Sequence, residues 1–229
     1  MLQSKGIITN LQREIIENFI KLKESNEFYL TGGTALSDFF LAHRRSFDLD
    51  IFTREKELIL PFSYILEEEF KKNFDIKILR RHETFLNYQI KKGRDETRIH
   101  IALDCPYRFE NPKDSNLGIK VNNYKDLIVD KLLTFFGRAE YRDAIDLFFI
   151  LKENDFWQLA NLAKEKDPGF DLYWLAISLN KVKEFPERIE DWFVEMIREV
   201  SVEDIKNLFS SLAKEIMNKI KFGGLYDTP

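Results

Sequence analysis

The sequence contains few of the residues that build disulfides and zinc sites. Its 229 residues include one cysteine, Cys105, and three histidines, so neither an internal disulfide nor a structural zinc site is expected. A lone cysteine is typical of a protein kept in a reducing cytoplasm. Any metal would then be bound by oxygen ligands, which favours Mg²⁺ or Mn²⁺.

Long hydrophobic runs are also missing. No apolar segment approaches the roughly 20 residues that a helix needs to cross a bilayer. The N-terminal sequence, MLQSKGIITN, lacks the charged and then apolar pattern of a signal peptide. We therefore expect a cytoplasmic protein that has no membrane partner. The net charge of −4 argues against a surface that binds nucleic acid everywhere, but it permits a local basic groove.

The residues that are present suffice for a large core, since 44% of them are hydrophobic and 21 are phenylalanines. Apolar spacing in the first half predicts helices and strands in alternation: helix 10–24, strand 28–30, helix 34–43, strand 45–53, helix 58–73, and strands 74–81, 84–91 and 97–104. After a loop at 106–118 every predicted element is a helix: 123–136, 140–152, 155–166, 170–184, 187–199 and 202–221.

These patterns predict an α/β (α+β) fold. A small mixed β-sheet flanked by helices is expected over residues 1–112, followed by a C-terminal helical bundle over residues 113–229.

The strand at 45–53 carries the first candidate site. Alternate residues of a strand share one face, so Asp48 and Asp50 point the same way as Arg44 and Ser46. The residues between them are expected in the core: Phe47, Leu49 and Ile51. Two carboxylates this close repel each other unless a cation lies between them, and a hard divalent metal fills that role. Taken alone, the pair could equally be part of a solvated polar face.

A glycine pair precedes this strand. Gly32 and Gly33 lie between strand 28–30 and helix 34–43, so backbone N–H groups at the positive end of a helix become available to a phosphate. Thr34 would add a hydroxyl donor. The alternative is a tight turn that needs the backbone freedom of glycine. Together the turn and the carboxylates predict a phosphate cradle beside a metal site, as nucleoside triphosphate chemistry requires.

The pattern GGTAL-x₆-HRRS-x-DLD resembles the nucleotidyltransferase superfamily that shares the DNA polymerase β-like catalytic core. More narrowly it resembles the AbiEii/AbiGii toxin family, the nucleotidyltransferases of type IV toxin–antitoxin and abortive-infection systems. The matching residues are Gly32, Gly33, Thr34, Ala35, Leu36, His43, Arg44, Ser46, Asp48 and Asp50. The resemblance implies that Asp48 and Asp50 are catalytic metal ligands. It also implies a nucleotide-binding set made of Gly32, Gly33, Thr34, Arg44 and Ser46.

Enzymes of this superfamily usually add a third carboxylate from a later strand. Strand 97–104 offers His100, Ala102 and Asp104 on one face. Asp104 is the candidate for the third metal ligand and catalytic carboxylate, although it lies at the end of the strand. The alternative is that the third position falls on Ala102, in which case the ligand is absent.

The helical half carries two charged residues in apolar surroundings. Lys131 lies at the edge of an apolar helix stripe, where a lysine usually extends its ammonium group to solvent. Asp146 interrupts the apolar run AIDLFFIL, and a buried carboxylate needs a cationic partner or a helix N-terminus.

These residues belong to a second pattern, Lys131-x₆-Arg138-x₃-Arg142-Asp143-x₂-Asp146-Leu147, which resembles the K-x₆-R-x₃-RD-x₂-DL signature of the same toxin family. The resemblance implies that Lys131 and Asp143 are catalytic, with Lys131 and Arg142 binding the nucleotide. For Asp146 we expect a structural ion pair that joins the two halves of the chain.

Basic residues cluster on the strands at 74–104: Arg80, Arg81, Lys91, Lys92, Arg94 and Arg98. They could form a groove for a nucleic-acid backbone. The alternative is that they protect strand edges against aggregation.

The resemblance and the residues together predict an enzyme, a Mg²⁺- or Mn²⁺-dependent nucleotidyltransferase. It would move a nucleoside monophosphate from an NTP to an acceptor and release pyrophosphate. By resemblance the acceptor is RNA, with tRNA a known choice, and the role is that of a toxin countered by a cognate antitoxin. Two alternatives stay open: a non-catalytic nucleotide- or RNA-binding protein of the same fold, and a nucleotidyltransferase that modifies a protein or small molecule.

Overall fold

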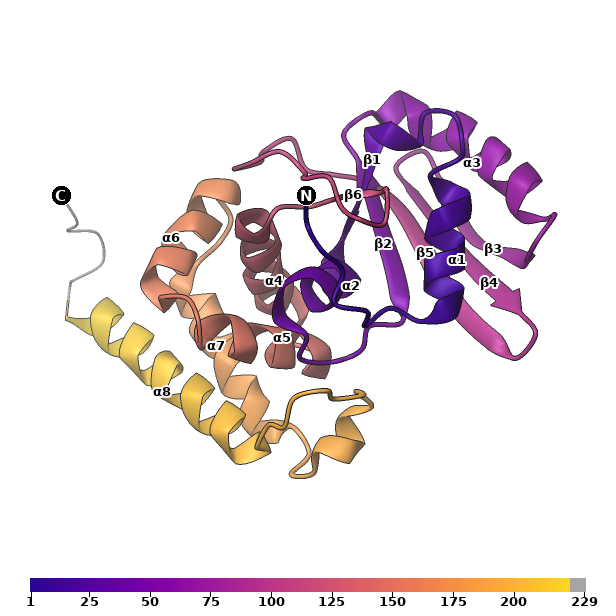
Figure 1. Ribbon diagram of the computed structural model, residues 1–229. Coiled ribbons are helices and arrows are strands. Elements are labelled where there is room, and N and C mark those ends of the chain that lie inside the picture. The colour runs from indigo at the N-terminus through magenta and orange to yellow at the C-terminus, as the bar shows by residue number, and fades with distance from the viewer. Residues whose placement is uncertain (223–229) are drawn as a thin grey trace. The chain divides into compact units, whose positions relative to one another are not determined.

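Segments in which apolar and polar residues alternate form the strands of a mixed sheet in the first part of the chain. In the computed structural model, which describes residues 1–222, this sheet has six strands in the order β3-β4-β5-β2-β1-β6 (Figure 1). The strands are β1 (Phe28–Thr31), β2 (Asp48–Thr53), β3 (Asp75–His82), β4 (Phe85–Lys92), β5 (Asp95–Leu103) and β6 (Lys120–Val121). Pairing is parallel between β2 and β5 and between β1 and β6, and antiparallel elsewhere.

The mixed sheet and the flanking helices confirm the predicted fold class. The short strand β6 was not predicted, because two residues are too few to show an alternation.

Two helices cover one face of the sheet. They are α1 (Asn10–Phe19), which begins at the capping residue Thr9, and α3 (Lys56–Phe70). Phe28 of β1 lies between them, with its ring centroid 5.9 Å from that of Phe19 and 4.3 Å from that of Phe62. The side chains of Leu49 and Ile51 point to this covered face and are fully buried. Asp48 and Asp50 therefore lie on the opposite face of β2.

A third helix connects β1 to β2. It begins as α2 (Gly32–Ala35) and continues directly as a π-helical segment, Leu36–Leu41. The predicted helix 34–43 thus starts two residues earlier and ends at Leu41, where Ala42 adopts a left-handed conformation with φ of 50°.

The chain forms two compact units, Met1–Leu127 and Ile128–Pro229. The domain boundary predicted at residues 112 and 113 stays a prediction. Helix α4 (Tyr124–Arg138) runs across residue 127, and the second unit continues with α5 (Tyr141–Leu151), α6 (Phe156–Lys166), α7 (Leu172–Lys181) and α8 (Val202–Lys221). Its core includes Phe135 and Phe209, whose ring centroids lie 5.4 Å apart.

The predicted helix at 187–199 was wrong. Within that range the one helical segment is a 3₁₀ turn, Ile189–Trp192, and the chain then adopts a left-handed conformation at Phe193, with φ of 52°. The side chain of Trp192 is buried among other aromatic rings. Across residues 1–222, no helix combines the length and apolar character needed to cross a membrane.

Candidate active site

The two carboxylates of the candidate site project from the middle of the sheet. On β2, Asp50 pairs with Thr31 of antiparallel β1 on one side and with His100 of parallel β5 on the other. Asp48 pairs with Arg98 of β5. Both carboxylates are partly exposed, and the strand's alternate residues Leu49 and Ile51 anchor it in the core. The prediction that Phe47 belongs to that core was wrong: the strand begins only at Asp48, and Phe47 is 49% exposed.

Gly32 lies directly against one of these carboxylates. A Cβ atom on Gly32 would be only 2.1 Å from Oδ2 of Asp50, so no side chain fits at this position. Its φ of 67° also lies in the left-handed region that favours glycine. Both requirements of the predicted tight turn are therefore met, and the same glycine brings the start of a helix next to Asp50.

The second glycine makes room for two polar side chains. A Cβ atom on Gly33 would lie 2.8 Å from Nη2 of Arg44 and 2.9 Å from Oγ of Ser46. The guanidinium of Arg44 is buried and its Nη1 donates to the carbonyl oxygen of Arg45 at 2.9 Å. Nε2 of Gln12, on α1, donates to the carbonyl oxygen of Ser46 at 2.9 Å and fixes this loop.

The structure thus brings together four of the predicted nucleotide-binding residues, Gly32, Gly33, Arg44 and Ser46, at the beginning of the helix that spans residues 32–41. Because the first N–H groups of a helix have no partner within the helix, this end carries a partial positive charge that suits an anion.

Thr34 has a different role from the predicted one. Its side chain is 1% exposed, and its hydroxyl group donates to the carbonyl oxygen of Asp48. Because a hydroxyl group has one proton, the donor expected for a phosphate is already used within the protein. Thr34 instead ties the helix to the strand that carries the carboxylates.

His100 is the side chain that the strand pairing adds to this site. Its Nδ1 lies 2.9 Å from Oδ1 of Asp50, and its ring stacks on Phe85 with 5.8 Å between centroids. The hydrogen bond with Asp50 raises the pKa of His100, assisted by the charges of Asp50 and Asp48, while burial opposes the shift. The sequence showed His100 on the correct face, but only the parallel register reveals that it stands beside Asp50.

Asp104 is not brought to the two carboxylates, contrary to its predicted role as third metal ligand. Asp50 is level with His100, and Asp104 lies four residues further along β5, about 13 Å away at roughly 3.3 Å per residue. Its carboxylate instead accepts a hydrogen bond from the Tyr29 hydroxyl and lies 3.3 Å from Nη2 of Arg108. Burial raises the pKa of Tyr29, which keeps this hydroxyl protonated as a donor.

The donor set fits a magnesium ion bound mainly through its substrate. Among the described residues, no group of three or more His, Cys, Asp and Glu side chains is arranged to hold a metal. Asp48 and Asp50 still offer two partly exposed carboxylates, and Mg²⁺ is commonly bound through one or two carboxylates with water and substrate phosphates in its other positions.

In the second unit, the residues of the second pattern form a buried charge network. Nζ of Lys131 lies 2.7 Å from Oδ2 of Asp146 and 3.6 Å from Oδ1 of Asp143. Arg138 holds the other side of Asp143 with two contacts, Nε to Oδ2 at 2.7 Å and Nη2 to Oδ1 at 3.1 Å. Both aspartates are fully buried, so two cations balance two carboxylates between α4 and α5.

One prediction is corrected by this network. Lys131 does not extend its ammonium group to solvent, because it is 8% exposed and pairs with Asp146. This pair of Asp146 lies within the helical unit, and the expected ion pair between the two halves of the chain stays a prediction. Arg142 has a half-exposed side chain, and its Nη2 lies 3.7 Å from Oε2 of Glu140.

The predicted basic cluster is partly neutralised by carboxylates. Arg81 pairs with Glu67, Lys91 lies 2.8 Å from Glu96, and Lys92 pairs with Glu14. Three exposed basic residues stay on the same sheet face as Asp48 and Asp50, as the strand register requires: Arg98 on β5 and Lys77 and Arg80 on β3.

Comparison with known proteins identifies a matching family. The family model described as the nucleotidyl transferase AbiEii toxin of type IV toxin–antitoxin systems matches residues 14–219. An uncharacterized protein of Aquifex aeolicus, aq_aa25, is 29% identical over 206 residues, which cover 82% of this chain and 95% of that protein.

Solved structures share the fold at low sequence identity. Protein JHP933 from Helicobacter pylori has a TM-score of 0.55 at 19% identity, covering 93% of this chain and 92% of its own. A putative nucleotidyltransferase from H. pylori has a TM-score of 0.56 at 18% identity, covering 96% and 100%. The nucleotidyltransferase toxin MenT4 from Mycobacterium tuberculosis has a TM-score of 0.53 at 15% identity, covering 91% and 82%.

Proposed function

The chain belongs to the nucleotidyl transferase AbiEii toxin family of type IV toxin–antitoxin systems, and on this premise we propose that it transfers a nucleoside monophosphate from an NTP to RNA. Membership of this family implies a nucleotide substrate and a cognate antitoxin. The observation that carries the proposal is the contact between Gly32 and Asp50, which joins a carboxylate to the positive end of a helix.

Asp48 and Asp50 would hold Mg²⁺ or Mn²⁺ in this reaction. A bound divalent metal supplies positive charge that stabilises the transferring phosphoryl group. The two carboxylates position that charge on the sheet face opposite to α1 and α3. Asp50 pairs with Thr31 of β1, which directly precedes the start of the helix at Gly32. His100, hydrogen-bonded to Asp50, orients this carboxylate and is a positioning residue.

The glycine turn would bind the phosphates of the NTP. Backbone N–H groups near Gly33 act as donors, and the Arg44 guanidinium adds a fixed positive charge beside them. The family signature would also assign Lys131 and Asp143 of the helical unit to the reaction, with Asp143, held by Arg138, orienting Lys131. Arg142 would add a second contact to the nucleotide.

The chemical step requires an acceptor hydroxyl group. Its oxygen attacks the α-phosphorus, the bond from that phosphorus to the bridging oxygen of the β-phosphate breaks, and pyrophosphate leaves. The hydroxyl proton passes to solvent. Support for RNA as the acceptor comes from Arg98, Lys77 and Arg80, which extend from the carboxylates across the open sheet face and suit a phosphate backbone.

Incubation with each α-labelled NTP, Mg²⁺ or Mn²⁺, and total cellular RNA and protein tests the proposal. We expect label in RNA that is lost in Asp48→Ala and Asp50→Ala. Asp75→Ala is the matched control, because Asp75 is an exposed carboxylate on the same face of the sheet, at the edge strand.

Two outcomes would replace the proposal. Label in protein or in a small molecule would favour a nucleotidyltransferase with another acceptor. Tight NTP binding without label in any fraction would favour a non-catalytic nucleotide-binding protein of this fold.

A further inference from the structure

A pocket in the helical unit is lined mainly by aromatic side chains. It has a volume of about 520 Å³ and lies where the turn between α4 and α5 meets the segment between α7 and α8. Its lining residues are Ala139, Glu140, Tyr141, Arg142, Phe185, Trp192 and Phe193. This volume falls within the usual range for small-molecule sites, roughly 300 to 1,000 Å³.

Three rings form a fixed wall of this pocket. Tyr141 lies 4.6 Å from Phe185 and 5.6 Å from Trp192, and Phe185 lies 5.4 Å from Trp192, measured between ring centroids. Trp192 is 1% exposed, and its Nε1 donates to the carbonyl oxygen of Pro186 at 2.9 Å. Because every ring contacts the other two, the wall is formed before any ligand binds.

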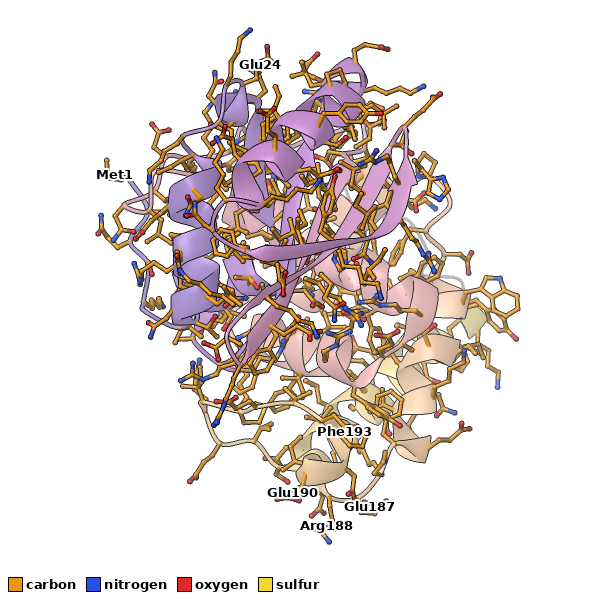
Figure 2. All side chains as sticks on the ribbon, turned by 90° about the vertical axis from the view of Figure 1, so that its right-hand side faces the viewer. Met1, Glu24, Glu187, Arg188, Glu190 and Phe193 are labelled. Atoms are coloured by element: carbon orange, nitrogen blue, oxygen red, sulfur yellow. The ribbon has the colours of Figure 1, made fainter. Side chains whose placement is uncertain are left out.

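Phe193 is a bulky apolar residue that the fold leaves at the surface. Its side chain is 90% exposed, and its backbone is left-handed, which a bulky residue rarely adopts. Figure 2 shows Phe193 on the same segment as Glu187, Arg188 and Glu190. Ala139, in the turn between α4 and α5, also lines the pocket and also has a left-handed backbone conformation, with φ of 47°. Strained backbone of this kind concentrates at ligand sites.

Two charged side chains complete the pocket. The Arg142 guanidinium and the Glu140 carboxylate lie 3.7 Å apart, and both side chains are about half exposed. A carboxylate accepts N–H groups, and a guanidinium donates to carbonyl or ring nitrogen atoms and to phosphate. Arg142 also adjoins Asp143 in the sequence, so the pocket borders the charge network of Lys131.

We propose that this pocket binds a nucleobase. A base is flat and stacks on aromatic rings, and its edge carries the donors and acceptors that Glu140 and Arg142 complement. An aliphatic ligand would form hydrogen bonds with neither charged group. The inference rests on the proposed nucleotidyltransferase activity, and the base comes either from the NTP or from the RNA acceptor.

Trp192 reports directly on this site. The sequence has three tryptophans, so Trp157→Phe with Trp174→Phe leaves Trp192 as the single tryptophan in the full chain, whose fluorescence is excited selectively over that of tyrosine. We expect its fluorescence to be quenched by NTPs or by a short single-stranded oligoribonucleotide. Inorganic tripolyphosphate and an abasic oligonucleotide, which have no base, should leave it unchanged.

Phe193→Ala should raise the dissociation constant measured from this quenching by roughly tenfold, the usual effect of losing one stacking contact. Folding is not at risk, because Phe193 is 90% exposed. The matched control is Tyr173→Ala, which removes a 44% exposed aromatic ring outside the pocket and should not change the affinity.

The outcomes separate the two sources of the base. Quenching by NTPs alone assigns the pocket to the nucleotide substrate, and quenching by the oligoribonucleotide alone assigns it to the acceptor. No quenching by either, or equal quenching by tripolyphosphate, overturns the inference. Asp50→Ala should abolish transfer and keep the quenching. If Phe193→Ala changes neither binding nor labelling while Asp50→Ala stops labelling, the pocket inference alone has failed.

Discussion

At Gly32 a single added methyl group would collide with the carboxylate of Asp50. We expect Gly32→Ala to lower nucleotide transfer by about 100-fold, because a displacement of about 1 Å at a reacting centre has this effect. The left-handed backbone adds a loss of about 1–2 kcal/mol in unfolding free energy. Steady-state labelling and urea unfolding measure the two effects.

Gly93→Ala is the matched control for this variant. Gly93 has a similar φ of 61°, but a Cβ atom there meets nothing within 4 Å. It should show a comparable loss of stability and normal activity. Equal activity in both variants would contradict the role given to the contact between Gly32 and Asp50.

The hydrogen bond from His100 to Asp50 makes stability depend on pH. Because the pKa of His100 is raised in the folded protein, its contribution is complete below the ordinary histidine pKa of about 6.5 and is lost as pH rises through the folded-state pKa. We expect His100→Gln to lower the unfolding free energy by on the order of 1 kcal/mol at pH 5.5, and by less at pH 9.

Urea unfolding across this range, in metal-free buffer, measures the difference between the two proteins. His82→Gln is the control, since His82 is exposed near the edge of the same sheet. A difference that is constant with pH would contradict the contribution assigned to His100.

At the scale of single residues, part of the site could be predicted from the sequence and part could not. The motif predicted that Asp48, Asp50, Gly32 and Gly33 belong to one site, because their spacing is local and set by a strand, a turn and a helix. The residue that stands beside Asp50 on the neighbouring strand could not be found this way. It depends on the register between β2 and β5, which are about 50 residues apart in the sequence. That register places His100 beside Asp50.

Between helices α4 and α5, removing one member of the buried charge network should be strongly destabilising. Lys131→Met removes the cation 2.7 Å from the fully buried Asp146, and we expect a loss of about 3–5 kcal/mol in unfolding free energy. Lys131→Met with Asp146→Leu should lose much less, because the buried carboxylate is then removed as well.

Lys72→Met provides the control for the lysine change. Nζ of Lys72 lies 2.6 Å from Glu69, but its side chain is 58% exposed, so the expected loss is under about 1 kcal/mol. Chemical denaturation of the unmodified protein, Lys131→Met, Asp146→Leu and the double variant gives the double-mutant cycle. A double variant as unstable as Lys131→Met would contradict the pairing.

Elements with strong local signals could be predicted from the sequence, and elements fixed by distant contacts could not. The predicted helix 202–221 matches α8, where Ser201 accepts from the backbone N–H of Asp204 as an N-terminal cap. The segment 187–199 has helical spacing too, but burial of Trp192 against Tyr141 and Phe185 outweighs it. Tyr141 lies about 50 residues earlier in the chain, so no local pattern predicts this contact.

For the whole molecule, binding of metal and nucleotide should appear as added stability. At a nucleotide concentration about 100 times the dissociation constant, mass action adds roughly 2.7 kcal/mol, which raises Tm by roughly 5–10 °C in a protein of this size. We expect this rise with Mg²⁺ and NTP together, and a smaller one after the metal is removed with EDTA.

Asp50→Ala should abolish the part of this rise that depends on Mg²⁺. Asp75→Ala, on the same sheet face, should keep it. A thermal shift of the unmodified protein that is equally large with Mg²⁺ and after EDTA would contradict the metal site assigned to Asp48 and Asp50.

The hydrogen bond from Thr34 to the backbone of Asp48 has a consequence for how the ligands influence each other. It fastens the start of the helix at residues 32–41 to the strand that carries the carboxylates, so the two move as one piece. A ligand that rigidifies one of these two segments therefore also rigidifies the other, which changes the affinity for the second ligand. By reciprocity, Mg²⁺ should raise the affinity for NTP by the same factor by which NTP raises the affinity for Mg²⁺, and Thr34→Val should shrink both factors together.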